Sequence, residues 1–477
     1  MAKRLWKVLG CAIAAVVLIS SCSSSPIILG VEKDGDKDTD LTPLSQLIQA
    51  DTEKIQLVLV HGVGDHCKNF ALDHKTGWLN DENLKAMGLT KIGSSGAELF
   101  ESNAANLTAL DGVAGCPDVV SKIVYQTQHY NLHLAERGKD IPVQAVEITW
   151  SPLTSWIKTR QLGYDSPNIL SDVEKIKADC LATPTENSKV LDKSRTQASP
   201  PSRMYANGLL KEDLMDRKLA DALLYSGTYG KIIQRGVAEV LCHVATKNNL
   251  DAQCTWPAAV PPDIAKSQYI FVTHSIGSRL MFDTILNLKN FRNATERNPF
   301  LHWLKPGADP TILANHIISK TSVVYMMANQ LPMLGLANLD PTVNSGDGPQ
   351  PYAVDPKRMR SSQAFNSQDG TCATMLGQFS QAKQDTKGTS EKLYIVSFND
   401  TNDLLTWHIP PWYTKAGQGT GECESNIELR NVFVQNSFRW LLFESPIAAH
   451  TAFFQNKDVW QAIACGGDKG KLKSCLQ

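Results

Sequence analysis

The sequence lacks an excess of charge of either sign: its 477 residues include 47 Lys and Arg against 48 Asp and Glu. Without a basic field there is little to attract a phosphate backbone, which argues against nucleic-acid binding. Only 20% of the residues are charged and 42% are hydrophobic, the balance of a water-soluble globular protein. Disordered, collagen-like and polytopic membrane classes are therefore excluded. At roughly 150 residues per domain, the length predicts about three domains, or one large domain with insertions.

Several motifs are also missing. There is no Cys-x-x-Cys pair, so a zinc ribbon or a thioredoxin-like site has no support. The sequence has no internal repeat and no cofactor-binding motif, and we expect no cofactor. Cysteine itself is present eleven times. An oxidising compartment favours pairing, and two close pairs are candidates for staples of local loops, Cys242 with Cys254 and Cys465 with Cys475.

Residues 1–21 have the form of a secretory signal peptide. Lys3, Arg4 and Lys7 precede an apolar run over residues 8–19, which is short for a membrane-spanning helix of about 20 residues. Ile19-Ser20-Ser21-Cys22 follows. An aliphatic residue, two small residues and a cysteine resemble the bacterial lipobox, whose cysteine is acylated and becomes the first residue of the mature protein. The alternative is an ordinary secretory signal that ends on a cysteine by accident.

The lipobox resemblance implies a lipid anchor on Cys22 in a bacterial cell envelope. Multiple acyl chains make a stable anchor, because each buried CH₂ contributes about 0.8 kcal/mol. Ser23 rather than Asp follows, and the resemblance to Gram-negative sorting then implies the outer membrane. Residues 22–51 are polar and rich in Ser, Asp, Lys and Gly, which predicts a solvated flexible tether. Residues 52–477 are the predicted folded domain.

Short runs of β-branched and aliphatic residues predict five buried strands. They cover residues 56–60, 143–150, 269–273, 323–328 and 393–398. Helical patterns fall between them, and the runs are apolar throughout rather than alternating. Strands of this kind that alternate with helices predict an α/β fold, with a mostly parallel central sheet covered by helices on both faces.

Two segments are too long for simple crossovers between strands. Residues 155–260 carry a helical pattern of leucines after a mixed polar stretch and are predicted to form a helical insert. Residues 339–390 are rich in Gly, Ser, Asp, Gln and Pro, which predicts a loop insert. Insertions of this kind often cap a site, and a solvated surface excursion is the alternative. The apolar positions of the first insert are Leu209, Leu210, Leu214, Leu219, Leu223 and Leu224.

The main chemical signal is the run Thr273-His274-Ser275-Ile276-Gly277, which follows the third strand and opens a helix. It is a G-x-S-x-G nucleophile elbow with Thr in place of the first Gly. The sharp turn holds the serine hydroxyl clear of the sheet, and the helix N-terminus favours negative charge nearby. Ser275 is therefore the candidate nucleophile. We expect His274 to pack against the elbow rather than to act as a base.

A serine nucleophile needs a histidine base and an acid that orients this base. With its elbow, the sequence resembles the α/β-hydrolase family, whose chain order is nucleophile, acid, histidine. The resemblance implies that the acid follows the fifth strand, and Asp403 is preferred because the family places it a few residues beyond the strand. Asp400 is expected to accept hydrogen bonds from amides two residues on, as Asp does in turns. His450, in a loop before a short helix at 459–464, is the candidate base.

The turn His61-Gly62 after the first core strand also matches the family. The resemblance implies that Val63 supplies one oxyanion-hole amide, and that Ile276 supplies the second. A rival interpretation takes His61, Asp65 and His66 as metal ligands. Zinc sites want three protein ligands, and no further histidine stands two residues after His61, so we expect no metal. A purely structural interpretation remains, with Ser275 as a helix N-cap, Asp403 as a loop acid and His450 as a surface residue.

The resemblance covers about residues 55–150 and 260–465. It implies a lipid-anchored serine hydrolase that cleaves carboxylic esters through an acyl-enzyme, with a small-molecule or lipid ester as substrate. Esterase, lipase, phospholipase, thioesterase and peptidase activities stay open, because the fold hosts all of them. The hypothesis from another class is a non-catalytic scaffold lipoprotein of the cell envelope that retains the fold. The sequence carries no signal for an oligomeric state.

Overall fold

The computed structural model places part of the chain. The described residues are 27–33, 36–37, 40–64, 66, 69–92, 98–101, 123–134, 138–151, 154, 158, 210–246, 254–291, 309–335, 375–387, 392–410, 413–414, 426–436, 445–468 and 471–472. The predicted signal peptide and Cys22 lie outside these ranges.

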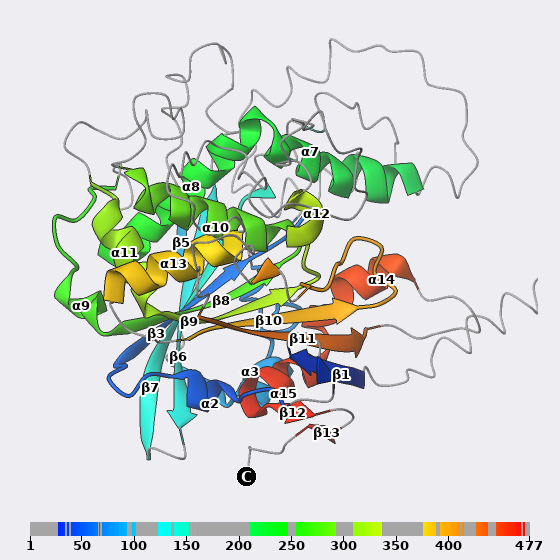
Figure 1. Cartoon of the computed structure of the whole chain (residues 1–477), viewed down its shortest axis with the longest axis horizontal. Helices are drawn as coiled ribbons and strands as arrows, with labels where there is room; N and C mark the ends of the chain where they lie inside the picture. The colour runs from blue at the N-terminus through cyan, green and yellow to red at the C-terminus, as the bar shows by residue number, and fades with distance from the viewer. Residues whose placement is uncertain are drawn as a thin grey trace, which may run out of the picture.

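A single open sheet runs through the centre of the described structure (Figure 1). Its eleven strands follow the order β2-β1-β11-β10-β9-β8-β3-β7-β6-β4, with β5 also paired to β6. The strands from β11 to β7 in this order run parallel, and antiparallel strands extend the sheet at both ends. The bounds are β1 (Ile27–Lys33), β2 (Asp36–Lys37), β3 (Lys54–Val60), β4 (Leu89–Lys91), β5 (Glu98–Glu101), β6 (Val124–Leu134), β7 (Lys139–Thr149), β8 (Ser267–His274), β9 (Thr321–Met327), β10 (Leu393–Asp400) and β11 (Ile427–Gln435); β12 (Gly467–Asp468) and β13 (Lys471–Leu472) form a separate pair.

Helices cover both faces of the sheet, as the uninterrupted apolar runs predict. β8 is buried along its whole length, which requires cover on each face. One face packs against α8, α10, α11 and α13, and the other against α2, α3 and α15 (Figure 1). None of the described helices is both long and apolar enough to cross a bilayer. The bounds are α2 (Leu44–Leu47), α3 (Asp81–Met87), η5 (Leu210–Leu219), α7 (Ala220–Ser226), α8 (Thr228–Thr246), α9 (Pro262–Ala265), α10 (Ile276–Lys289), α11 (Thr311–Lys320), α12 (Leu331–Gly335), α13 (Met375–Lys387), α14 (Pro446–Thr451), η10 (Ala452–Phe454) and α15 (Lys457–Cys465).

All five predicted strands are present, as β3, β7, β8, β9 and β10. The prediction of a solvated tether over 22–51 is wrong in part, because Ile27–Lys33 forms β1 and pairs with β11. Leu41, Leu44 and Leu47 are buried in the core beneath the sheet. Scattered apolar residues in this polar stretch therefore contribute to the fold.

The described part of the segment predicted as a helical insert forms η5, α7 and α8. One leucine of its apolar pattern points outward, since Leu223 is 70% exposed. The predicted disulfide Cys242–Cys254 is formed at the end of α8. Cys465 is also disulfide-bonded, and Cys475 lies outside the described residues.

The loop insert predicted over 339–390 is described only in its last part. There the prediction is wrong, because Met375–Lys387 forms α13, whose buried side chains pack against α10 and α11. Its polar composition hid an amphipathic helix, in which Leu376, Phe379 and Ala382 lie on one face.

Candidate active site

Ser275 stands at a strained turn between β8 and α10. Its backbone has φ 53° and ψ −127°, a conformation that costs a residue with a side chain on the order of 1–3 kcal/mol. The turn is tight: a Cβ on Gly277 would lie 2.6 Å from the carbonyl oxygen of His61. Thr273, the departure from the elbow pattern, places its hydroxyl 2.7 Å from that of Ser278 across the turn. The departure thus adds a hydrogen bond where the pattern has glycine.

His450 and Asp403 form a buried pair beside this turn. The Nδ1 atom of His450 lies 2.7 Å from Oδ2 of Asp403, and both side chains are almost fully buried. The same carboxylate accepts the backbone N–H of Leu405 at 2.9 Å and the hydroxyl of Thr406. These donors fix the carboxylate, so that Nδ1 of His450 carries its hydrogen and Nε2 is left as the acceptor. His450 lies in the short helix α14 and not in a loop, which corrects the prediction.

Among the side chains of Ser275, Asp403 and His450, two buried polar atoms have no hydrogen-bond partner in the described part of the chain. They are Oγ of Ser275 and Nε2 of His450. Buried polar atoms are nearly always paired, and exceptions call for a functional reason. Catalytic hydrogen bonds are often long or poorly aligned before substrate binds. An unpaired hydroxyl and an unpaired imidazole nitrogen are the two atoms between which a serine hydrolase passes a proton.

His274 links the turn to the base. Its Nε2 atom lies 2.8 Å from the carbonyl oxygen of His450, so Nε2 carries the hydrogen and donates it. Burial holds the pKa of His274 well below its usual value, and the ring is neutral at neutral pH. The ring also contacts Phe454, at a centroid distance of 4.9 Å. His274 therefore packs against the segment that carries His450 and Phe454.

The turn after β3 lies directly against the candidate nucleophile. A Cβ on Gly62 would come within 2.4 Å of Cβ of Ser275, so only glycine fits. Gly64, two residues on, has φ 105°, which favours glycine for its conformation. This close approach places the amide of Val63 near Ser275. Ile276 is the first residue of α10, where a helix N–H has no partner within the helix.

His61 orients the peptide that carries the Val63 amide. Its Nε2 atom accepts the N–H groups of Trp150 at 3.0 Å and Ser151 at 3.3 Å. Nδ1 therefore carries the hydrogen and donates to the carbonyl of Gly62 at 2.7 Å. Because this carbonyl and the Val63 N–H belong to one planar peptide, fixing the carbonyl also fixes the direction of the N–H. Burial keeps the pKa of His61 well below its usual value, which maintains the neutral ring.

The same contacts bear on the rival metal interpretation. Both ring nitrogens of His61 are already occupied by backbone groups. Asp65 lies outside the described residues. Within the described part of the chain, no three His, Cys, Asp or Glu side chains are grouped so as to hold an ion.

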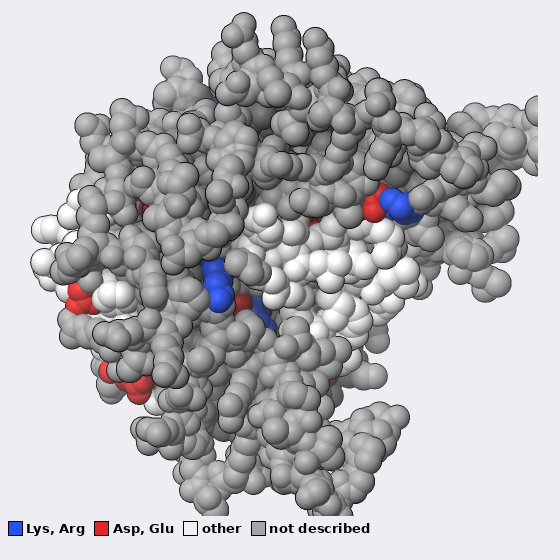
Figure 2. All heavy atoms as spheres, turned by 90° about the horizontal axis from the view of Figure 1, so that it is seen from above, with Lys and Arg blue, Asp and Glu red and all other residues white. Residues whose placement is uncertain are grey.

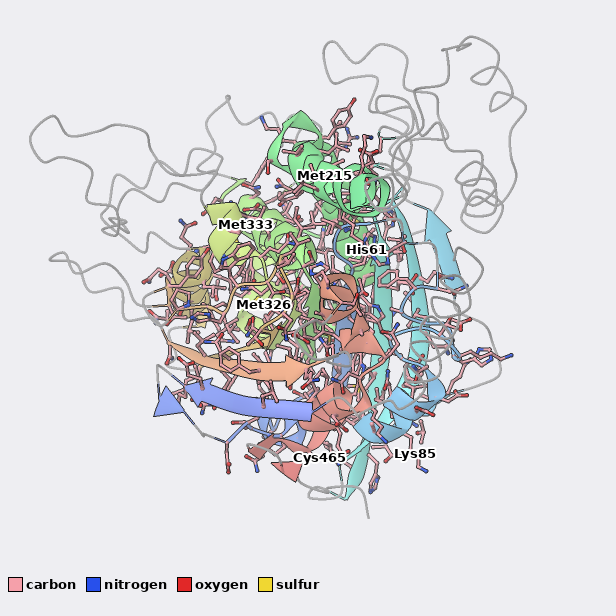
Figure 3. All side chains as sticks on the ribbon, turned by 90° about the vertical axis from the view of Figure 1, so that its right-hand side faces the viewer. His61, Lys85, Met215, Met326, Met333 and Cys465 are labelled. Carbon is pink, nitrogen blue, oxygen red and sulfur yellow. A yellow bond between two sulfur atoms is a disulfide. The ribbon has the colours of Figure 1, made fainter. Side chains whose placement is uncertain are left out.

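Sequence reasoning missed two buried acids, one that holds this turn and one that holds the loop after it. Asp221 of α7 accepts the N–H of Gly64 at 2.7 Å, and its carboxylate is buried 2.9 Å from Nζ of Lys158. Glu147 of β7 accepts the amides of Ala71 at 2.8 Å and Leu72 at 2.9 Å, and burial raises its pKa to about 7. The one sequence feature that could have indicated such a role was an acidic residue, Glu147, within the apolar run of β7. Figure 3 shows His61 beneath the insert segment that carries Met215.

Asp400 has the structural role predicted for it. One carboxylate oxygen accepts the N–H of Asn402 at 2.9 Å, and the other accepts the N–H of Asn436 at 2.7 Å. Asn436 in turn donates from its side chain to the carbonyl of Ala449 at 3.0 Å. Asp400 thus supports the helix that carries His450 through Asn436.

Comparisons with known proteins add no assignment: no family model, no curated protein and no solved structure matches this chain.

Proposed function

We propose that this chain is a serine hydrolase with an α/β-hydrolase fold that cleaves carboxylic esters through an acyl-enzyme. The observation that carries the proposal is the buried pair of His450 and Asp403 at 2.7 Å, next to a strained serine. The open, mostly parallel sheet supports it, because Ser275, Asp403 and Val63 all follow the carboxyl ends of parallel strands, where ligands bind in α/β sheets.

In this proposal Ser275 Oγ attacks the ester carbonyl, and His450 Nε2 accepts its proton. Asp403 maintains the tautomer that leaves Nε2 available, and it stabilises the imidazolium that forms. The amides of Val63 and Ile276 donate to the oxyanion. His450 then gives the proton to the departing alcohol. In the second half-reaction His450 takes a proton from the water that attacks the acyl-enzyme. It then returns this proton to Ser275 Oγ as the bond to the acyl group breaks and the acid is released.

A fluorophosphonate probe tests this function directly. We expect covalent capture of the wild-type protein at Ser275, located by peptide mass spectrometry, because an activated serine forms a stable phosphonyl adduct. The matched control is Ser278→Ala, which removes a nearby hydroxyl of α10 and leaves Ser275 in place; it should still be labelled. An unlabelled, folded wild type would instead support the non-catalytic scaffold.

We further propose that Cys22 is acylated in a bacterial cell envelope, in the outer membrane. The support is the lipobox-like run that ends at Cys22, which lies outside the described residues. Metabolic labelling with a palmitate analogue should tag the wild type and not Cys22→Ala, and only the wild type should fractionate with membranes. Equal labelling of the two proteins, or a soluble periplasmic wild type, would overturn the assignment.

A further inference from the structure

We propose that the edge of the sheet that carries the candidate active site faces the membrane holding the lipid anchor, and that the substrate is a lipid ester in that membrane. We call this the carboxyl edge, since it is formed by the carboxyl ends of β3, β8, β9, β10 and β11. The inference rests on the proposed hydrolase function and on acylation of Cys22.

The chain enters the sheet at the carboxyl edge. β1 is antiparallel to β11, and its first residue, Ile27, pairs with Gln435, the last residue of β11. The next residue, Asn436, holds the carbonyl of Ala449, which precedes His450. The start of β1 therefore lies close to the helix of the candidate base. In Figure 1 the strands of the parallel sheet point to the right, and α14 lies on that side.

The tether is too short to place the anchor elsewhere. Between Cys22 and Ile27 there are five residue steps, which span at most about 18 Å when fully extended. β1 has seven residues and is about 23 Å long at 3.3 Å per residue. An acyl chain on Cys22 therefore cannot reach the opposite edge of the sheet. The anchor therefore holds the membrane within reach of the carboxyl edge.

Exposed apolar side chains gather on segments at this edge. Among the described residues five large apolar side chains are exposed, and four of them belong to the acid loop or to the insert. Leu404 follows Asp403 directly and is 67% exposed; Trp407 closes the same loop. Exposed apolar groups of this kind mark contact surfaces, and Trp favours the interface between water and lipid.

The insert reaches the carboxyl edge through Asp221. Because this residue accepts the N–H of Gly64, α7 lies over the turn that contacts Ser275. Leu223 follows two residues later and is the most exposed of the five apolar side chains. Met215, on η5, is 48% exposed. Figure 2 shows the molecule from above, from the side of the insert, where uncharged residues lie beside a few Lys, Arg, Asp and Glu side chains. Exposed apolar side chains on the segments around a tethered site fit a bilayer.

The test lengthens the tether. A flexible Gly/Ser segment of about 40 residues, inserted after Ser25, has an r.m.s. span of roughly 35 Å and frees the orientation of the domain. Wild type and variant are reconstituted as full-length lipoproteins into phosphatidylethanolamine–phosphatidylglycerol vesicles. Hydrolysis of a fluorogenic lipid ester in the vesicles is compared with that of a short water-soluble ester. We expect the ratio of the two rates to fall about tenfold in the variant, because the effective concentration of lipid at the site falls.

A pair of surface variants tests the same orientation without changing the tether. Leu223→Glu places a charge on the proposed membrane face. Ile92→Glu is the matched control, because Ile92 is also exposed but follows β4 at the far end of the sheet. The ratio of rates should fall in the first variant and stay unchanged in the second.

The outcomes separate the claims. An active, anchored protein whose ratio of rates survives both the linker and Leu223→Glu would overturn this inference alone. A wild type that neither hydrolyses the soluble ester nor reacts with the fluorophosphonate would overturn the proposed function and the inference with it. A third outcome is a ratio of lipid-ester to soluble-ester rates that falls in Leu223→Glu and stays unchanged in the linker variant. It would assign the exposed surface around Leu223 to a protein partner and would also overturn the membrane orientation.

Discussion

Alanine at Ser275 or at His450 is expected to abolish ester turnover, and the double variant is expected to be no slower than either single one. The two side chains supply one event, the passage of a proton from Oγ to Nε2 during attack, so that removal of either atom removes all of it. In one well-studied serine protease, removal of either the triad serine or the triad histidine lowers kcat about 10⁶-fold. The measurement is kcat for the wild type, both single variants and the double variant with a water-soluble ester. If the loss of kcat in the double variant equalled the product of the two single losses, Ser275 and His450 would not act in one shared proton transfer.

Stability provides the control for this comparison. Because the Ser275 hydroxyl is buried without a partner in the described structure, Ser275→Ala removes an unsatisfied group and should unfold no more easily than the wild type. A gain of about 1 kcal/mol in the free energy of unfolding is expected from that term. An inactive variant of raised stability separates chemistry from folding. If folded Ser275→Ala retained wild-type rates, Ser275 would not be the nucleophile.

The parallel core of the sheet was predictable because burial on both faces leaves an apolar run in the sequence. β8, with every residue buried, carries the clearest signal of this kind. β6 left no such run, since it buries the polar side chains of Gln126, Thr127 and Gln128. β1 was hidden for another reason. It lies in a polar segment beside the two-residue edge strand β2, and its partner β11 is about 400 residues away in the sequence, so no local pattern predicts the pairing.

The residues of the candidate site likewise include some that a sequence motif locates and some that only tertiary packing brings to the site. Ser275, Asp403 and His450 stand at ends of elements and follow a family order, so motif and context locate them. The residues that hold the oxyanion turn have no motif. Asp221 meets Gly64 across 157 positions of sequence, and the contact depends on how the insert folds back over the sheet. A contact such as the one between Asp221 and Gly64 depends on tertiary packing, and the spacing of residues along the chain does not predict it.

Asparagine at Asp403 should reduce kcat far more than asparagine at Asp400. At position 403 the carboxylate accepts a hydrogen bond from His450 Nδ1. Asparagine places an amide NH2 group there, which can donate a hydrogen bond to Nδ1. The imidazole then favours the tautomer with its hydrogen on Nε2, which cannot take the serine proton. In a well-studied serine protease the corresponding change of the triad aspartate to asparagine lowers kcat about 10⁴-fold, although the geometry is kept. A comparable loss is expected for Asp403→Asn at pH 7 to 8.

Asp400→Asn is the matched control, because it makes the same chemical change three residues earlier. Both oxygens of Asp400 accept backbone N–H groups, so an asparagine loses one of these two bonds. The expected cost is about 1–3 kcal/mol in the free energy of unfolding. Through Asn436 the change also loosens the helix of His450, and kcat should fall by no more than about tenfold, since one bond of support is lost and the tautomer is unaffected. Measured together, kcat and urea unfolding distinguish the roles: a larger fall in kcat for Asp400→Asn than for Asp403→Asn would make Asp400 the acid of the triad, against the contact that Asp403 makes with His450.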